Sequence, residues 1–302
     1  MSVHSSISLL LVLLLPPLLL GVVNKTKAAF GGRNGPPLLQ PYYDLRKLLG
    51  KGMVLSSATT GVFLAGPVVT LAATLAAALL VPLGHHAAVI AFPGDMILFA
   101  YLLALGRFFT AAAALDTGSP FEGMGASREV TFAWLAEPAL FLGFVALARM
   151  SGSYSLSGML ADPAVAPIHH MGPMVLIVAG WFIVLLAENC RIPFDDPNTH
   201  LELTMIHEVM VLDHSGPALG VIVYGASVKL FLFTALVLGA LLPFSANAWT
   251  DWLLFVASAI GTAVLLGVVE STMARLRLLH VPKLLVSGSL LTAFAIVFQL
   301  HR

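Results

Sequence analysis

Cysteine is almost absent from this sequence, since Cys190 is the only one among 302 residues. A single cysteine excludes an internal disulfide, and it excludes an iron–sulfur cluster held by cysteines of this chain alone. Charged residues make up only 10% of the sequence, whereas about 25% is typical of soluble domains. The 15 basic and 15 acidic residues cancel, so the net charge offers no argument for nucleic-acid binding. If the protein takes part in electron transfer, other chains carry the electrons.

Apolar residues are abundant: they amount to 59% of the sequence and give a mean hydropathy of +0.95. Soluble domains are about 45–50% apolar, so we predict an integral membrane protein. The expected fold is all-α and polytopic, with about eight transmembrane helices, large cytoplasmic loops and a single transmembrane domain over residues 1–302. No internal repeat or linker is visible. The predicted spans are residues 7–23, 53–83, 95–115, 129–148, 171–187, 218–242, 252–269 and 283–300.

The distribution of lysine and arginine predicts the orientation of these spans. The first apolar run is expected to remain as a span, because no basic residue precedes it as in a signal peptide. The loops after the first, third, fifth and seventh spans hold eleven of the 15 basic residues. Cytoplasmic loops carry such an excess, so both termini are predicted on the non-cytoplasmic side of a prokaryotic inner membrane. All the large polar loops then lie on the cytoplasmic face, as a docking surface for a soluble partner would.

The most basic of these loops, residues 24–51, is also rich in glycine and proline up to about Tyr42. From Tyr42 onward, tyrosines and leucines form an apolar face opposite Asp44, Arg46 and Lys47, as in a short interfacial helix. A plain positive-inside loop is the alternative, and it explains the charge but not the Gly-Pro-Pro geometry.

The stretch Ala187–Gly216 concentrates acidic residues between two apolar spans. Its sequence, AENCRIPFDDPNTHLELTMIHEVMVLDHSG, carries six of the 15 acidic residues and one basic residue, Arg191. Carboxylates next to apolar spans are costly unless they are paired or functional. Asp196-Pro197 is a favourable helix start and Gly216-Pro217 a favourable stop, so we expect a helix that enters a water-filled cavity. The six acids are Glu188, Asp195, Asp196, Glu202, Glu208 and Asp213.

Three histidines in the same stretch, His200, His207 and His214, do not have the spacing of a metal site. Seven-residue steps on one helix face place successive histidines about 10.5 Å apart, whereas ligands lie about 2 Å from a metal ion. No metal site is predicted from them. His169 and His170 are expected at the outer end of the fifth span, as interfacial residues.

Ionisable residues inside the spans suggest a proton relay. Arg107, Glu137, Lys229 and Glu270 lie within spans or at their ends, where ionisable groups are usually functional. The alternative is a structural ion pair such as Arg107 with Glu137. The segment DTGSPFEGMGASRE, with Asp116, Glu122, Arg128 and Glu129, is predicted to be a second charged cytoplasmic loop without the pattern of a phosphate-binding loop. Carboxylates kept from bulk water have raised pKa values and exchange protons near neutral pH.

The acidic stretch resembles a loop of the family that contains the membrane-embedded subunit 1 of respiratory complex I. Its A-E-x-N-R-x-P-F-D pattern, followed by acids and E-L, matches here with one residue of latitude before Arg191. The segments RNGPPLLQPYYDLRKLL, GASRE with Glu137 beyond it, and ARLRLLHVPKLL are similar to further family motifs. The resemblance thus extends over nearly the whole chain.

One branch of this family fits better than the quinone-reducing members. Those members usually carry glutamates just after P-F-D-x-P, where this chain has Asn198 and His200. The phrase NTHLELTMIHEVMVLDHSGP closely resembles the membrane subunit of formate hydrogenlyase and hydrogenase-4, called subunit 4 or component C. The resemblance therefore implies a membrane anchor of a group 4 [NiFe]-hydrogenase complex. A quinone-reactive subunit of a complex I-like enzyme is the second interpretation, and a stand-alone transporter or a purely structural anchor are the others.

The resemblance implies a division of labour between this chain and its partners. [NiFe] large and iron–sulfur small subunits would dock on the cytoplasmic face, and antiporter-like subunits would lie beside it in the membrane. The NiFe centre and iron–sulfur clusters are expected in those partners, with no cofactor, catalytic centre or metal in this chain. The residues expected in a proton or sodium relay are Glu129, Glu137, Glu188, Glu202, Glu208, Glu270, Arg107 and Lys229. Those expected in docking are Arg33, Gln40, Asp44, Arg191, Asp195, Asp196, Asp213 and Arg275.

Overall fold

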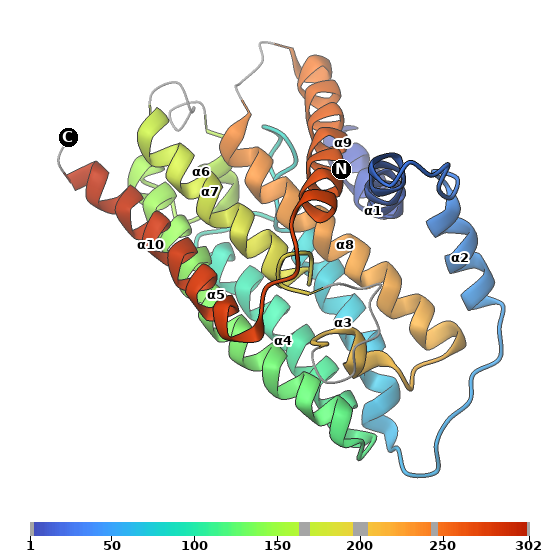
Figure 1. Ribbon diagram of the computed structural model, residues 1–302. Coiled ribbons are helices and arrows are strands. Elements are labelled where there is room, and N and C mark those ends of the chain that lie inside the picture. Colours follow the sequence, from blue (N-terminus) through green and yellow to red (C-terminus); the bar gives the residue numbers. More distant parts are fainter. Residues whose placement is uncertain (1–2, 163–169, 196–204, 243–246, 301–302) are drawn as a thin grey trace.

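The computed structural model describes residues 3–162, 170–195, 205–242 and 247–300, and within them the fold is all-α (Figure 1). Eight helices are long and apolar enough to cross a membrane, which confirms the predicted polytopic fold. The helices are α1 (Val3–Phe30), α2 (Gln40–Leu49), α3 (Gly61–Ala78), α4 (Asp95–Asp116), α5 (Pro120–Ser151), α6 (Leu156–Leu160), α7 (Met171–Glu188), α8 (Gly216–Leu241), α9 (Ala248–Thr272) and α10 (Val281–Leu300), with the short 3-10 helices η2 (Glu208–Val211) and η3 (Leu278–His280).

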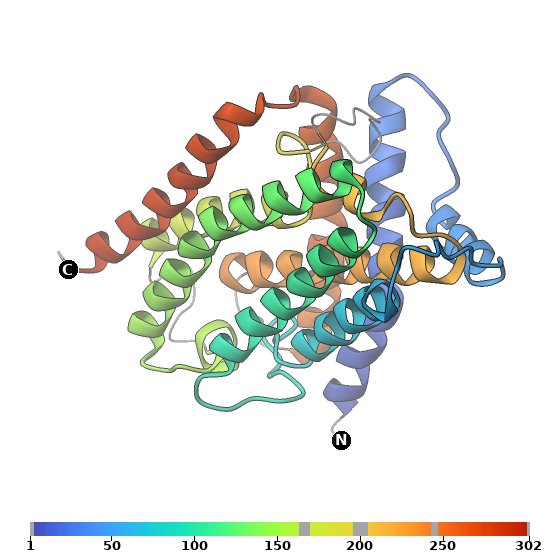
Figure 2. The same ribbon diagram turned by 90° about the horizontal axis from the view of Figure 1, so that it is seen from below.

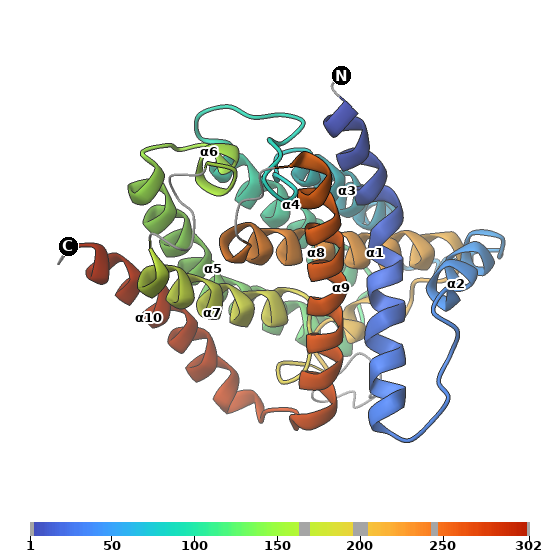
Figure 3. The ribbon, with the colours of Figure 1, turned by 90° about the horizontal axis from the view of Figure 1, so that it is seen from above.

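Helix α8 lies at the centre of the bundle, in contact with α1, α2, α3, α7 and α9. It is apolar around its whole circumference and is the most buried of the spans, as expected for a helix surrounded by others. Figure 3 shows α1 and α9 side by side across α8, with α5, α7 and α10 grouped beside them. From the opposite side, α3, α4 and α5 follow one another in front (Figure 2). The ionisable residue in the middle of α8, Lys229, is therefore partly buried within the bundle.

Two adjacent prolines lie inside α1, and tyrosines from two other helices bind the backbone just before them. Pro17 has no N–H, so the carbonyl of Leu13, four residues earlier, lacks its helical donor. The hydroxyl of Tyr224 in α8 donates to that carbonyl at 3.0 Å and replaces the missing donor. The hydroxyl of Tyr42 in α2 donates to the neighbouring carbonyl of Leu14, which keeps the Leu18 N–H as its helical partner in sequence. Side chains that satisfy freed carbonyls are what allows proline within a membrane span. These bonds also attach α1 to α8 and α2.

The predicted short helix after the basic loop is present as α2, Gln40–Leu49, and none of its side chains is buried. It starts with a proline in its first turn and lies against α8 and α1. The predicted span 53–83 was too long, because the helix covers only Gly61–Ala78. Thr60 caps its start with a side-chain oxygen that accepts from the Val62 N–H. The carboxylate of Asp116, at the end of α4, also accepts from the Thr60 N–H at 2.7 Å.

Two other sequence expectations were wrong. The charged segment 116–129 is mostly not a loop, because α5 begins at Pro120 and continues to Ser151. Proline is favourable in the first helical turn, and the glycines that suggested a loop allow close packing: a Cβ on Gly125 would overlap Val209. The continuous helix expected from Asp196 to Gly216 is also absent in its described part, since residues 205–215 contain only the short η2. Contacts with Asp195 and Arg128 hold that segment in place of helical hydrogen bonds.

Candidate functional site

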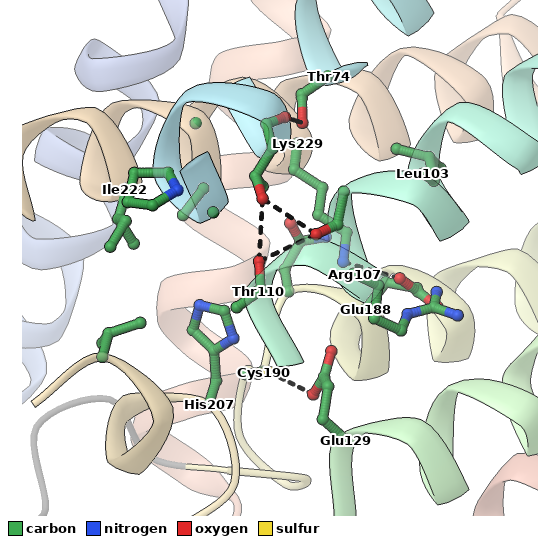
Figure 4. Close-up of a pocket in the computed structure, with 18 of the residues that line it drawn as sticks. Thr74, Leu103, Arg107, Thr110, Glu129, Glu188, Cys190, His207, Ile222 and Lys229 are labelled. Carbon is green, nitrogen blue, oxygen red and sulfur yellow. Dashed lines mark hydrogen bonds and ion pairs between the residues drawn. The ribbon is translucent and has the colours of Figure 1, made fainter. Parts of the chain in front are cut away.

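Two cavities inside the bundle share a wall of charged residues. The first, about 110 Å³, lies between α3, α4, α5, α8 and the segment that follows α7 (Figure 4). The second, about 130 Å³, lies between α4, α5, α7 and α8. Leu103, Arg107 and Glu188 line both cavities. Arg107 Nε is buried and has no hydrogen-bond partner among the described residues, and each cavity has room for several water molecules.

Arg107 on α4 holds two carboxylates from different helices. Its Nη2 donates to Glu188 Oε1 at 2.7 Å, and its Nη1 donates to Glu137 Oε1 at 2.9 Å. Glu188 is the last residue of α7, and Glu137 lies in the middle of α5. The Arg107–Glu137 ion pair considered from the sequence is thus present, but within a larger group of charges. Planar guanidinium donors suit this simultaneous contact with two carboxylates.

Lys229 completes this group from the centre of α8. Its Nζ lies 2.8 Å from Glu188 Oε2, so Glu188 is shared by two cations. The side chains of Arg107, Glu188 and Lys229 are 12%, 5% and 21% exposed, whereas that of Glu137 is 40% exposed. Removing one partner of such a buried pair leaves an uncompensated charge, at a cost of about 3–5 kcal/mol. The four residues, called the central ion network below, extend from the first cavity to the partly exposed Glu137, which lines the second cavity.

A second group of ion pairs lies where α9 ends. Glu270 is in contact with Lys27 of α1 at 2.7 Å and with Arg191 at 3.2 Å, and its side chain is fully buried. Next to it, Asp195 pairs with Arg275 at 2.8 Å. These pairs connect the ends of α1 and α9 with the segment after α7. These ion pairs hold the segment after α7 on the bundle, which is a structural role.

Three side chains of different chemistry meet on the wall of the first cavity. Potential metal-ligating atoms of Glu129, Cys190 and His207 all lie within 4.8 Å of one another. The Cys190 Sγ lies 3.8 Å from Glu129 Oε2, as the dashed line in Figure 4 marks. Burial raises the pKa of the Cys190 thiol well above its usual range, and the charges of Glu129 and Asp195 raise it further. The thiol is therefore protonated at neutral pH.

His214 also lines the first cavity, and its ring stacks on Phe63 with centroids 3.9 Å apart. Burial lowers the pKa of His214 from its ordinary value of 6.5, since a charged imidazole loses hydration there. A neutral ring is consistent with stacking on an apolar partner.

The structure brings together five of the eight residues predicted as a relay. Glu129, Glu137, Glu188, Arg107 and Lys229 line one or both cavities. Glu270 belongs to the separate group at the end of α9, and the partly buried Glu208 begins η2 without lining either cavity. Glu202 lies outside the described residues, as does Asp196 among the docking predictions. The relay role itself stays a prediction.

The residues predicted for docking divide by exposure. Arg33, Asp44 and Asp213 are exposed, and Gln40 donates to Asp44 on α2 at 2.9 Å. In contrast, Asp195 is only 1% exposed and Arg191 and Arg275 are engaged in the ion pairs described above. The latter three therefore have a structural role within the chain, and the exposed residues remain predicted docking positions.

Sequence reasoning missed the partners that only tertiary structure supplies. Cys190 was used only to exclude an internal disulfide and a cysteine-held iron–sulfur cluster, and His207 was considered only together with His200 and His214. Lys27 was counted for orientation, although it pairs with Glu270 across 243 positions in sequence. Asp95, fully buried, binds the Ser155 hydroxyl and the Leu156 N–H and so holds α6. The sequence could have indicated these contacts only through carboxylates near predicted helix ends, such as Asp95 and Glu270.

The fold and the site define a polytopic, all-α membrane protein with a buried ion network between two internal cavities. A family model described as NADH dehydrogenase matches residues 3–300. The chain therefore belongs to this NADH dehydrogenase family, which confirms the resemblance to the membrane-embedded subunit 1 of complex I.

The similar proteins include members of the predicted hydrogenase branch. Formate hydrogenlyase subunit 4 of Escherichia coli (strain K12) is 32% identical over 284 residues, which cover 90% of both chains. Hydrogenase-4 component C of the same strain is 32% identical over 297 residues, covering 96% of this chain and 93% of that one. A chain in the structure of the membrane-bound sulfane sulfur reductase, an archaeal respiratory membrane complex, covers 98% of both chains with a TM-score of 0.84 and 22% identity, and shares the fold.

Proposed function

We propose that this chain is the membrane anchor and coupling subunit of a group 4 [NiFe]-hydrogenase complex of the formate hydrogenlyase or hydrogenase-4 type. It docks a soluble hydrogenase module on the cytoplasmic face of a prokaryotic inner membrane. It links the redox reaction of that module to the movement of protons or sodium ions by neighbouring membrane subunits. Similarity over nine-tenths or more of the chain to subunits of both enzyme types supports this assignment.

The central ion network is the observation that carries the coupling role. It connects Lys229 and the first cavity, through Glu188 and Arg107, to Glu137 on α5. Charged groups within a bilayer are expensive, and they commonly mark an ion path. A network in which one carboxylate is shared by two cations can redistribute its pairs when a proton enters or leaves. That redistribution is the physical basis for transmitting a redox event into the membrane.

The exposure of Glu137 supports a neighbouring membrane subunit. Its side chain is 40% exposed although it lies in the middle of the 32-residue helix α5. Glu137 lines the second cavity together with the exposed Tyr101, and contact of its carboxylate with lipid at that depth would be strongly unfavourable. A second membrane protein that covers α4 and α5 removes this cost and receives the end of the network. The exposed Tyr101 of α4 and Trp134 of α5 are consistent with such an interface.

The soluble module is proposed to dock on the loops that follow α1, α4, α7 and α9. By the excess of basic residues these loops face the cytoplasm, and they carry the exposed Arg33, Asp44 and Asp213. The ion pairs of Glu270 and Asp195 hold the loops after α7 and α9 to the bundle. A docking surface tied to the network through the same segment provides a short mechanical path between the two.

The test is to purify the complex through a tag on this subunit and to determine its subunits, metals and activity. Nickel together with iron, and hydrogen evolution, are the expected results. Iron with flavin, quinone reduction that inhibitors block, and no nickel would instead identify the quinone-reactive subunit of a complex I-like enzyme. A chain that purifies alone would contradict the anchor role altogether.

A further inference from the structure

We propose that Glu129, Cys190 and His207 form a binding site for a single Zn²⁺ ion on the wall of the first cavity. The three residues come from α5, from the turn after α7, and from the segment before η2. Their donor atoms lie within 4.8 Å of one another. A thiolate, an imidazole and a carboxylate are the ligand types that Zn²⁺ takes in proteins. This set differs from His200, His207 and His214, the three histidines considered from the sequence, and shares only His207 with them.

The geometry is close to that of a coordination sphere. Zn²⁺ ligands lie about 2.0–2.3 Å from the ion in a tetrahedron, so their mutual separations are roughly 3.5 Å. The Cys190 Sγ and Glu129 Oε2, at 3.8 Å, already approach this separation. The donor atoms are at most 4.8 Å apart, so side-chain movements of about 1 Å bring all three to the separation that Zn²⁺ requires. His207 Nδ1 is buried and has no hydrogen-bond partner among the described residues, so no existing bond with Nδ1 must be broken.

The backbone around the site is held by other contacts. Asp195 Oδ2 accepts from the N–H of His207 at 3.2 Å and of Ile206 at 2.9 Å, and Arg275 fixes that carboxylate. Arg128 Nη1 donates to the Met205 carbonyl at 3.0 Å, which ties the same segment to α5 next to Glu129. Supporting contacts of this kind orient ligands and commonly change metal affinity about 10–100-fold.

The chemistry of the site suits a cation. The carboxylate of Glu129 lies within 4.8 Å of the other two donor atoms, and its negative charge attracts a cation to this position. Binding of Zn²⁺ replaces the thiol proton by a zinc–sulfur bond and releases that proton to solvent. Three protein ligands leave a fourth position, which faces the cavity and takes a water molecule. An ion held in this way removes Glu129 from proton exchange, which on the proposed function would inhibit ion transfer.

Metal binding is measured directly on the full-length chain purified in detergent, first with Co²⁺ and then with Zn²⁺. Because Cys190 is the only cysteine, a thiolate-to-cobalt charge-transfer band reports on this site alone. The expected result is one Co²⁺ per chain with that band, which added Zn²⁺ abolishes. In the zinc form, X-ray absorption is expected to show one sulfur at about 2.3 Å. Failure of this binding is distinct from failure of the proposed function, which is tested on the assembled complex.

Four variants make the test specific. Cys190→Ser is expected to lose the charge-transfer band, and His207→Asn and Glu129→Gln to weaken Co²⁺ binding at least about tenfold. His214→Asn changes a histidine that lines the same cavity but is not one of the three proposed ligands, and this variant is expected to bind Co²⁺ as the native chain does. Circular dichroism confirms that each chain retains its helices. The proposal would be overturned if the folded native chain shows no charge-transfer band. It would also be overturned if His207→Asn and Glu129→Gln bind Co²⁺ as tightly as the native chain does.

Discussion

The replacement Glu188→Gln tests the energetics of the central ion network. Glutamine keeps the shape of the side chain but removes the charge that Arg107 contacts at 2.7 Å and Lys229 at 2.8 Å. In the native chain the charges of the network cancel, because it contains two cations and two carboxylates. In the variant Arg107 keeps Glu137, at 2.9 Å, whereas Lys229 loses the carboxylate with which it is paired. One positive charge is then left without its partner within the bundle.

The expected loss of stability is about 3–5 kcal/mol, the range for removing one partner of a buried ion pair. The estimate applies because Arg107, Glu188 and Lys229 are all less than one-quarter exposed. The double variant Glu188→Gln/Lys229→Met restores the balance of charge and is expected to recover most of the loss. As a control, Asp213→Asn changes an exposed carboxylate, whose replacement is expected to stay within about 0.5 kcal/mol.

Free energies of unfolding are measured in mixed micelles by titration with a denaturing detergent, with tryptophan fluorescence as the signal. The four chains of the cycle, native, two single variants and the double variant, give the coupling energy between Glu188 and Lys229. A Glu188→Gln variant as stable as the native chain would refute the reasoning. A double variant less stable than both single variants would also refute it.

Two further predictions concern stability. Because burial lowers the pKa of His214 below 6.5, the unfolded state binds more protons in acid, and stability should fall as the pH drops below about 6.5. His214→Phe, which keeps a ring on Phe63, should make that fall smaller when unfolding midpoints are compared at about pH 7.5 and pH 5.5; an unchanged fall would contradict the assignment. Gly143→Ala places a methyl group against the Trp181 indole and should cost about 1–3 kcal/mol in unfolding titrations, whereas Gly261→Ala, with open space around it, should not destabilise.

The spans were predictable from the sequence because hydropathy is a local property. The central helix α8 differs from its predicted range, 218–242, by two residues or fewer at each end. The start of α5 was missed because the glycines and charges before Glu129 are typical of loops. The tight fit of Gly125 against Val209 depends on a segment far away in the sequence. Local composition contains no information about such packing.

The candidate site was predictable in its residue types but not in its pairings. Ionisable residues in spans stand out, so Arg107, Glu137 and Lys229 were identified individually. That Glu188 is shared by two of them depends on where α4, α7 and α8 meet, which the sequence does not state. The meeting of Cys190 with Glu129 likewise joins positions 61 residues apart. The segment after α7 was expected to be helical because Asp196-Pro197 and Gly216-Pro217 are favourable helix ends. Its contacts with Asp195 and Arg128 could not be known from the sequence.

The most direct test of the coupling role is the number of ions moved per hydrogen molecule formed in vesicles that contain the assembled complex. Glu137→Gln changes the exposed end of the central ion network. The control is Tyr101→Phe, because Tyr101 is a neutral residue that lines the second cavity together with Glu137. We predict that Glu137→Gln lowers this ratio at least about tenfold, as loss of a proton-transferring group does in catalysis, while partner subunits remain bound and Tyr101→Phe keeps the native ratio. A native ratio in an intact Glu137→Gln complex would contradict the account.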